Sequence, residues 1–192
     1  MSYAASISND AVAALEAVHF AGTIEVVDTH EALLRACRDL VSHSVIGFDT
    51  ETRPSFTAGV TNKVALLQLS TNERCYLIRL NRVPLCRELI AVLQSPRVKK
   101  VGADVKNDIR ALNALRHFKA QGFVDLQDEV VRFGIEDKSL RKISGIVLGQ
   151  RVSKAQRLSN WEAKSLTPQQ QMYAATDAWV CIEIYRRLLA SE

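Results

Sequence analysis

The stretch VIGFDTETRP, residues 45–54, decides the fold class of this chain of 192 residues. Its first four residues are apolar and rich in β-formers, which is typical of a central strand buried on both faces. The strand then runs into Asp49 and Glu51 before it reaches Pro54. Because alternate residues of a strand share a face, both carboxylates point the same way. Two readings follow: a pair of solvent-facing acids, or a site for a hard divalent cation such as Mg²⁺ or Mn²⁺ that offsets their repulsion.

Patterns of strands and helices follow one another along the rest of the chain. Further strands are expected at 23–29, 63–70, 74–80 and 97–104. Helices are expected at 29–43, 83–95, 105–118, 124–134 and 139–149, with a last helix from Thr167-Pro168 to residue 189. This order predicts an α/β layer fold. With no repeat or Pro/Gly linker, we expect a single domain over 23–192, preceded by a loosely ordered lead-in at 1–22.

Composition and charge limit the class of protein and of partner. Hydrophobic residues make up 47% and charged residues 24% of the chain, as in ordinary globular proteins. No membrane span or signal peptide is evident, and four scattered cysteines predict reduced thiols in a cytoplasm. Residues 138–164 combine one acid, Glu162, with seven basic residues: Lys138, Arg141, Lys142, Arg151, Lys154, Arg157 and Lys164. Such a segment suits a phosphate-backbone partner, or is simply a solvated basic helix and loop.

The last helix carries an acid on its apolar side. Tyr173, Asp177, Val180, Ile184 and Leu188 are spaced to form one stripe, and the three aliphatic members must face the core. Asp177 is therefore directed inward, where a carboxylate needs a cation or a proton. The alternative is an acid that points sideways to water and is favoured slightly by the helix dipole.

A second helical acid, Asp108, borders the stripe that includes Val105 and Leu112. Asp104, at the strand exit, is interpreted instead as the cap of this helix. Together with Asp49, Glu51 and Asp177, Asp108 would make a group of four converging carboxylates. Four carboxylates would hold two divalent cations, the arrangement used in phosphoryl transfer.

Three motifs carry a family resemblance. DTE at 49–51, VGADVKNDIRAL at 101–112 and YAATD at 173–177 resemble the exonuclease motifs of the DEDD superfamily of 3′-5′ exonucleases. VALLQLS at 64–70 and LSNWEAKSLTPQQQMYAATDAW at 158–179 resemble its ribonuclease D and Werner-type branch. The resemblance covers nearly the whole chain. It implies a ribonuclease H-like fold, with a mixed sheet of five to six strands flanked by helices.

The resemblance also implies roles for single residues. Asp49 would ligate both metals, Glu51 and Asp177 would complete the shell of the first, and Asp108 would hold the second through water. The spacing of Tyr173 and Asp177 matches the tyrosine variant, in which the tyrosine orients the attacking water. The four histidines of the chain all lie far from this helix.

Substrate contacts are expected from four further residues. The backbone of Thr50 could meet the 3′-hydroxyl, and Phe56 could wedge against the terminal base unless it tucks onto the domain. Arg157 could contact a phosphate. Trp161 could stack on a base or belong to the core.

The resulting hypothesis is a two-metal-ion 3′-5′ exonuclease that acts on single-stranded DNA and/or RNA with a free 3′ end. It would release nucleoside 5′-monophosphates. The alternatives are a non-catalytic nucleic-acid-binding module with the same fold, and an exoribonuclease that acts on short RNA. The chain ends soon after the last helix, which predicts a stand-alone exonuclease domain.

Overall fold

The strand that carries the two acids lies in the interior of a six-stranded sheet with the order β1-β4-β3-β2-β5-β6. The computed structural model describes residues 3–57, 59 and 61–192. The strands are β1 (Thr23–Val27), β2 (Val45–Thr52), β3 (Val64–Ser70), β4 (Arg74–Arg79), β5 (Lys99–Gly102) and β6 (Phe123–Asp125). β3 pairs antiparallel with β2 and β4, while the other pairs are parallel. The prediction of a mixed sheet flanked by helices is thereby confirmed.

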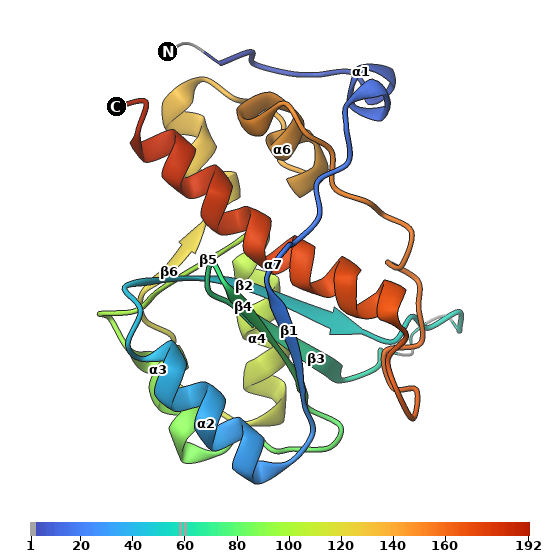
Figure 1. Cartoon of the computed structure of the whole chain (residues 1–192), viewed down its shortest axis with the longest axis vertical. Coiled ribbons are helices and arrows are strands. Elements are labelled where there is room, and N and C mark those ends of the chain that lie inside the picture. The colour runs from blue at the N-terminus through green and yellow to red at the C-terminus, as the bar shows by residue number, and fades with distance from the viewer. Residues whose placement is uncertain (1–2, 58, 60) are drawn as a thin grey trace.

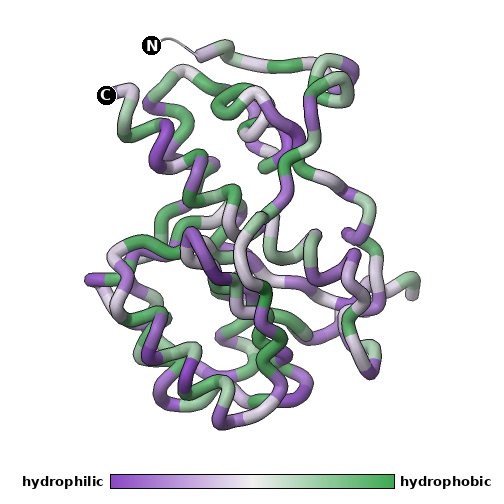
Figure 2. Tube along the Cα trace, in the orientation of Figure 1, coloured by the Kyte–Doolittle hydropathy of each residue, from purple (hydrophilic) through white to green (hydrophobic). Residues whose placement is uncertain are grey.

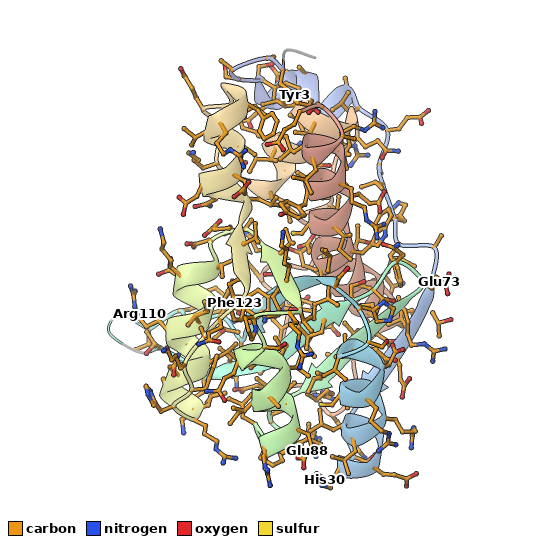
Figure 3. All side chains as sticks on the ribbon, turned by 90° about the vertical axis from the view of Figure 1, so that its left-hand side faces the viewer. Tyr3, His30, Glu73, Glu88, Arg110 and Phe123 are labelled. Atoms are coloured by element: carbon orange, nitrogen blue, oxygen red, sulfur yellow. The ribbon has the colours of Figure 1, made fainter. Side chains whose placement is uncertain are left out.

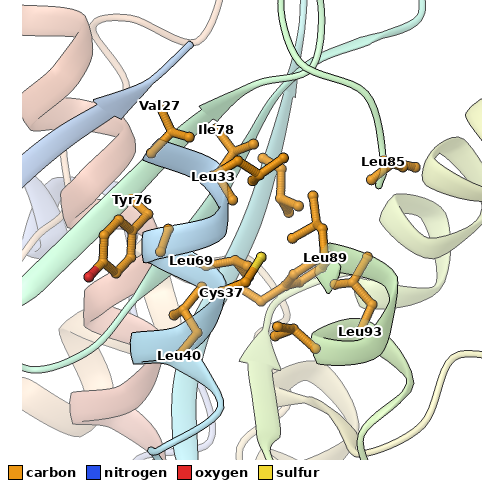
Figure 4. Packing of buried hydrophobic residues seen from close by; sticks show 14 of the residues in the cluster. Val27, Leu33, Cys37, Leu40, Leu69, Tyr76, Ile78, Leu85, Leu89 and Leu93 are labelled. Carbon is orange, nitrogen blue, oxygen red and sulfur yellow. The ribbon is translucent and has the colours of Figure 1, made fainter. Parts of the chain in front are cut away.

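Helices cover both faces of this sheet (Figure 1). The helices are α1 (Asn9–Ala14), α2 (His30–Leu40), α3 (Arg87–Gln94), α4 (Val105–Leu115), α5 (Leu126–Glu129), the 3₁₀ turn η1 (Val130–Phe133), α6 (Leu140–Leu148) and α7 (Pro168–Leu189). One face, here called the α2–α4 face, packs on α2, α3 and α4 through an apolar cluster, part of which is shown in Figure 4. The opposite face, the α7 face, packs on α7, with α6 beyond it. Figure 2 shows polar and apolar residues alternating along α2 and α7, as expected for helices with one buried side. None of the helices in the described ranges is both long and apolar enough to cross a membrane.

Helix α7 begins where the sequence predicts. The Thr167 side chain accepts from the Gln170 backbone N–H, and the Gln170 side chain accepts from the Thr167 N–H, which forms a capping box ahead of Pro168. Val180 and Ile184 of the predicted stripe are buried, as is Asp177. The inward direction of Asp177 is therefore a property of the helix register.

A glycine sets how closely α7 approaches β2. A Cβ atom built at Gly47 would collide with the carbonyl oxygen of Ala178. Only a residue without a side chain fits this contact. Asp49 lies two residues after Gly47, and Asp177 lies one residue before Ala178. The crossing point of strand and helix thus brings these two acids to the same place.

Two expectations about local structure are confirmed only in part. The segment expected to be a helix from residue 124 begins with the short strand β6, because Phe123–Asp125 pairs with β5, and only then becomes α5 and η1. Asp104 occupies the cap position of α4 in a left-handed conformation, but its side chain caps nothing. The Asp125 carboxylate instead accepts from the backbone N–H groups of Asp104 (3.2 Å) and Val105 (2.9 Å). A residue 20 positions away in sequence therefore caps this helix.

The N-terminal segment contributes to the packed structure from Tyr3 onward. Val12 of α1 and Phe20 are buried. The Phe20 N–H donates to the Thr176 hydroxyl on α7 (3.1 Å). Tyr3 lies at the top of the molecule in Figure 3, and its hydroxyl donates to the carbonyl of Arg187 near the end of α7. The N-terminal segment therefore runs along α7 and contacts it at both ends.

Candidate active site

Three carboxylates meet where α7 crosses the end of β2. One oxygen from each of Asp49, Glu51 and Asp177 lies within 4.8 Å of the others. Asp49 and Glu51 share the α7 face of β2 through strand alternation, while Asp177 reaches down from the helix. Asp177 is 7% exposed and the two strand acids are half-buried. Sequence reasoning expected these three side chains to converge, and the structure brings them together.

Burial and mutual repulsion disfavour the charged forms of these acids. The pKa of Glu51 is raised to about 10, first by burial and then by Asp49 and Asp177. Burial raises the pKa of Asp177 to about 7, partly offset by a hydrogen bond from Tyr173. The pKa of Asp49 also lies well above its usual value, through burial and the neighbouring Asp177. An all-oxygen donor set with this excess of negative charge fits a hard divalent cation.

Asp108 approaches the same strand end from the other side of the sheet. Thr50 points to the α2–α4 face, and its hydroxyl donates to Asp108 Oδ1 at 2.5 Å. The Thr50 N–H donates to Asp49 Oδ1 at 2.9 Å. The pKa of Asp108 is raised to about 8, first by burial and then by Asp49. Thr50 therefore links two acids, and its backbone N–H is engaged by one of them.

Tyr173 lies one turn before Asp177 on α7. The pKa of its hydroxyl is raised far above the usual range by burial and by the nearby acids at 177 and 51. The hydroxyl therefore keeps its proton at every physiological pH. Its ring packs on Trp161, with ring centroids 6.0 Å apart. Tyr173 is a fixed hydrogen-bond donor at the edge of the acid cluster.

Trp161 belongs to the core, so of the two readings given for it, base stacking is the one that the structure contradicts. The side chain is fully buried in a cluster with Leu66 and Ala174, so its faces are not accessible to a base. Arg79, also buried, holds this segment in place by donating to the backbone carbonyls of Ala163 and, at 3.0 Å, Lys164. Sequence reasoning missed Arg79. The signal was a charged residue that shares the face of Leu77 in a strand otherwise apolar on that face.

Phe56 and Arg157 lie on two exposed segments beside the acids. Phe56, in the loop after β2, is 86% exposed and does not tuck onto the domain. Arg157 is exposed and close enough to Glu51 to lower its pKa against the effect of burial. The two segments are joined by an ion pair of Arg53 with Glu162 at 3.2 Å. Ala58 and Val60 of the first loop lie outside the described residues.

A cavity of about 370 Å³ runs along α7 beside Tyr173 and Asp177. Its wall is formed by the segment 153–156, by the first turns of α7, and by Val18 and His19 from the N-terminal segment. The expectation that all histidines lie far from this helix is therefore wrong, because His19, although distant in sequence, lines the same cavity as α7. No sequence pattern indicates this contact, since it joins residues more than 150 positions apart.

The basic segment is only partly available to a ligand. Lys142 pairs with Asp137 at 2.7 Å, and Arg151 donates to the Leu15 carbonyl at 2.9 Å. Lys138 donates to the Gln127 carbonyl. Within the described part of the chain, Lys154 and Arg157 make no side-chain hydrogen bond or ion pair, and both flank the cavity. Arg141 and Lys164 likewise make no side-chain hydrogen bond or ion pair there, and of these basic residues Arg157 lies close enough to Glu51 to lower its pKa.

Comparisons with known proteins agree with this geometry. A profile described as 3′-5′ exonuclease matches residues 24–191. The chain is 35% identical over 153 residues to the mouse bifunctional 3′-5′ exonuclease/ATP-dependent helicase WRN, across 75% of this chain and 11% of that protein. It is 36% identical over 151 residues to the Drosophila melanogaster exonuclease 3′-5′ domain-containing protein 2, across 75% of this chain and 25% of that protein. The chain therefore spans a quarter or less of the length of these two relatives.

Solved structures show the same architecture. The exonuclease domain of Aedes aegypti Nibbler superposes with a TM-score of 0.76 at 26% identity, over 87% of both chains. Escherichia coli RNase D superposes with a TM-score of 0.79 at 23% identity, over 88% of this chain and 44% of that one. The sheet order and the flanking helices are thus those of a ribonuclease H-like fold.

Proposed function

Since this chain belongs to the 3′-5′ exonuclease family, we propose that it removes nucleotides one at a time from a free 3′ end of nucleic acid. The reaction is hydrolysis of the terminal phosphodiester, with release of a nucleoside 5′-monophosphate. One observation carries the proposal: three acids from two separate elements present their oxygens within 4.8 Å of one another. An acid cluster of this kind is costly to a fold unless a cation is bound there.

Two divalent cations, Mg²⁺ or Mn²⁺, are proposed as cofactors. Asp49, Glu51 and Asp177 would hold one, and Asp108 together with Asp49 would hold the other. When bound, such ions supply positive charge that stabilises the attacking and leaving oxygens of a phosphoryl transfer. Thr50, which donates to both Asp49 and Asp108, fixes the relative positions of the two groups of ligands.

Tyr173 is proposed to orient the attacking water, as in the tyrosine variant of the family. Its hydroxyl is held beside Asp177, keeps its proton, and is braced by Trp161 behind the ring. Asp177 can accept a hydrogen bond from the same water. The pair thereby restricts the direction of attack, and positioning of this kind contributes much of the catalysis in phosphoryl transfer.

The substrate is proposed to be a single strand. Phe56 projects from its loop as a platform for a base, and base stacking tolerates any sequence. Arg157 and Lys154 supply charge for phosphates next to the acids. The Escherichia coli neighbour is described as an exoribonuclease involved in structured RNA processing, so RNA is tested on equal terms with DNA.

The test is digestion of matched DNA and RNA oligonucleotides, labelled at the 5′ or the 3′ end, with Mg²⁺, Mn²⁺ or a chelator. We expect 5′-labelled strands to shorten by single nucleotides and 3′-labelled strands to release labelled mononucleotide at once, only with a cation. Binding without cleavage in every cation would favour the non-catalytic module. Cleavage confined to short RNA would select the exoribonuclease.

A further inference from the structure

A buried glutamine on β3 has no partner for its amide. Gln68 is fully buried, and neither its Nε2 nor its Oε1 has a hydrogen-bond partner among the residues that the structure describes. Buried side-chain amides are usually hydrogen-bonded, so an exception calls for an explanation from function. In VALLQLS, residues 64–70, Gln68 is also the one polar residue between the two ends of a buried strand.

The sheet register places Gln68 next to the acid cluster. Gln68 is the cross-strand partner of Asp49 in the antiparallel pair of β3 and β2. Directly opposed residues of such a pair share a face, with Cβ atoms about 4.5–5.5 Å apart. The shared face is the α7 face, because Gly47, two residues before Asp49, contacts Ala178 of α7. The Gln68 amide therefore lies on the side of the sheet where Asp49, Glu51 and Asp177 meet.

Two carboxylates lie near Gln68 along the ladder, Asp49 directly opposite it and Glu51 on the diagonal, and Asp49 is the nearer of the two. On the other side, its cross-strand partner is Leu77. Its neighbours on the same face of β3 are Leu66 and Ser70, and the Ser70 hydroxyl already donates to the Thr71 carbonyl at 2.8 Å. Asp49 accepts from the Thr50 N–H through Oδ1. Its Oδ2 has no hydrogen-bond donor within the described ranges.

We propose that Gln68 is a positioning residue for Asp49, whose Oδ2 accepts from the Gln68 Nε2–H when a divalent cation is bound by the acid cluster. With Oδ1 fixed by Thr50 and Oδ2 by Gln68, the plane of the carboxylate is set from both sides. Such outer partners of ligating carboxylates orient them and raise the affinity for the metal. Rotation of the side-chain torsions is enough to make this contact, since the two residues already face each other across the ladder. The inference rests on the proposed function for the identity of the ligand.

The test measures Mn²⁺ binding by calorimetry on the whole chain, together with the melting temperature in chelator. Gln68→Met keeps the length of the side chain and removes the amide. We expect it to melt at or above the wild-type temperature in chelator, because a buried amide without a partner is gone. We also expect it to bind Mn²⁺ about 10-fold or more weakly. The matched control, Leu77→Met, alters the packing on the other side of Gln68 and should bind Mn²⁺ as wild type does.

Two results would overturn the assignment. One is a Gln68→Met protein with wild-type Mn²⁺ affinity. The other is a loss of affinity that follows a lower melting temperature, which would indicate a packing role alone.

A second variant keeps the test decisive if Gln68→Met folds poorly. Gln68→Glu adds a carboxylate beside Asp49, so Mn²⁺ should raise its melting temperature more than that of wild type. An equal rise in both proteins would place the side chain away from the acids and overturn the proposal. Wild-type protein that binds Mn²⁺ but cleaves no nucleic acid would contradict the proposed function alone, and the calorimetry would still test Gln68.

Discussion

Both faces of the sheet are covered by helices, but the two faces differ in whether their buried polar side chains have hydrogen-bond partners. On the α2–α4 face the one deeply buried charge, Lys100, donates to the carbonyls of Ser95 and Val98, both at 2.7 Å, and lies over the Phe123 ring. On the α7 face, three fully buried polar side chains of the described chain keep nitrogen or oxygen atoms without partners: Gln68, Arg79 and Trp161. The carboxylates at 49, 51 and 177 crowd beside them.

This difference indicates that the α2–α4 face mainly stabilises the fold, while the α7 face carries the residues of the candidate active site. A buried polar group without a partner costs about 1–3 kcal/mol, so several of them on one face must be offset elsewhere. The apolar clusters on both faces supply that offset, and the one between the sheet and α2, α3 and α4 is shown in part in Figure 4. Phe48 and Asp49 are adjacent in sequence and point to opposite faces. Phe48 belongs to the apolar core, and Asp49 belongs to the acid cluster.

The largest effect is expected from Asp49→Ala. Loss of the carboxylate shared by both proposed cation sites should lower kcat by about 10³-fold, equivalent to about 4 kcal/mol in the barrier. The melting temperature in chelator should stay the same or rise, because repulsion with Asp177 and Glu51 is relieved. Single-turnover digestion and thermal melting measure the two quantities. Asp128→Ala, which removes an exposed acid, is the control, and near-normal activity of Asp49→Ala with Mn²⁺ would contradict the site.

Phe48→Ala should give the opposite pattern. Truncation of this fully buried ring, which packs edge-on against Phe123, should lower the free energy of unfolding by about 3 kcal/mol. Activity per folded molecule should change little, since the side chain points away from the acids. Urea denaturation in chelator gives the first value. A large loss of kcat at temperatures where the variant is fully folded would mean that packing on the α2–α4 face also controls activity on the α7 face.

The stability of the cation-free protein should fall as pH rises from 5 to 8. The folded-state pKa values of Asp177, about 7, and Asp108, about 8, lie above those of the unfolded chain. The folded state therefore holds protons that the unfolded state has lost, so unfolding becomes easier with rising pH, and Asp177 alone accounts for on the order of 2 kcal/mol. Urea titrations in chelator at several pH values measure this slope. Asp177→Asn should make the slope smaller, because Asp108 still titrates, and an unchanged slope in that variant would contradict the assignment.

Tyr173→Phe should have the smallest effect of the four. Without the hydroxyl that is proposed to orient the attacking water, the chemical step should slow about tenfold, or about 1.4 kcal/mol. The ring still packs on Trp161, so folding and Mn²⁺ affinity should be preserved. Rapid-quench kinetics separate the chemical step from binding. Weakened Mn²⁺ binding with an unchanged chemical step would show that the residue supports the cation instead.

Features set by local pattern were predictable from the sequence, and features set by pairing were not. The capping box at Thr167 and the inward direction of Asp177 follow from residues within one helix, and the strand end at Asp49 follows from strand alternation. The strand β6 has three residues, and only its pairing with β5 identifies it. The Asp125 cap on α4, the return of His19 to α7 and the opposition of Gln68 to Asp49 all join distant residues. Each depends on a sheet register or chain path that no short window contains.

The path of the N-terminal segment has a consequence for comparing this chain with its relatives. Residues 16–18 exchange backbone hydrogen bonds with Arg151, and Phe20 is tied to Thr176 on α7. This segment fixes the rim of the cavity, yet it precedes residue 24, where the family profile begins to match. A protein trimmed to the matched region would keep Asp49, Glu51, Asp108 and Asp177 and still lose the N-terminal segment that packs against α7. The segment that precedes the family match is thus in direct contact with the helix that carries Tyr173 and Asp177.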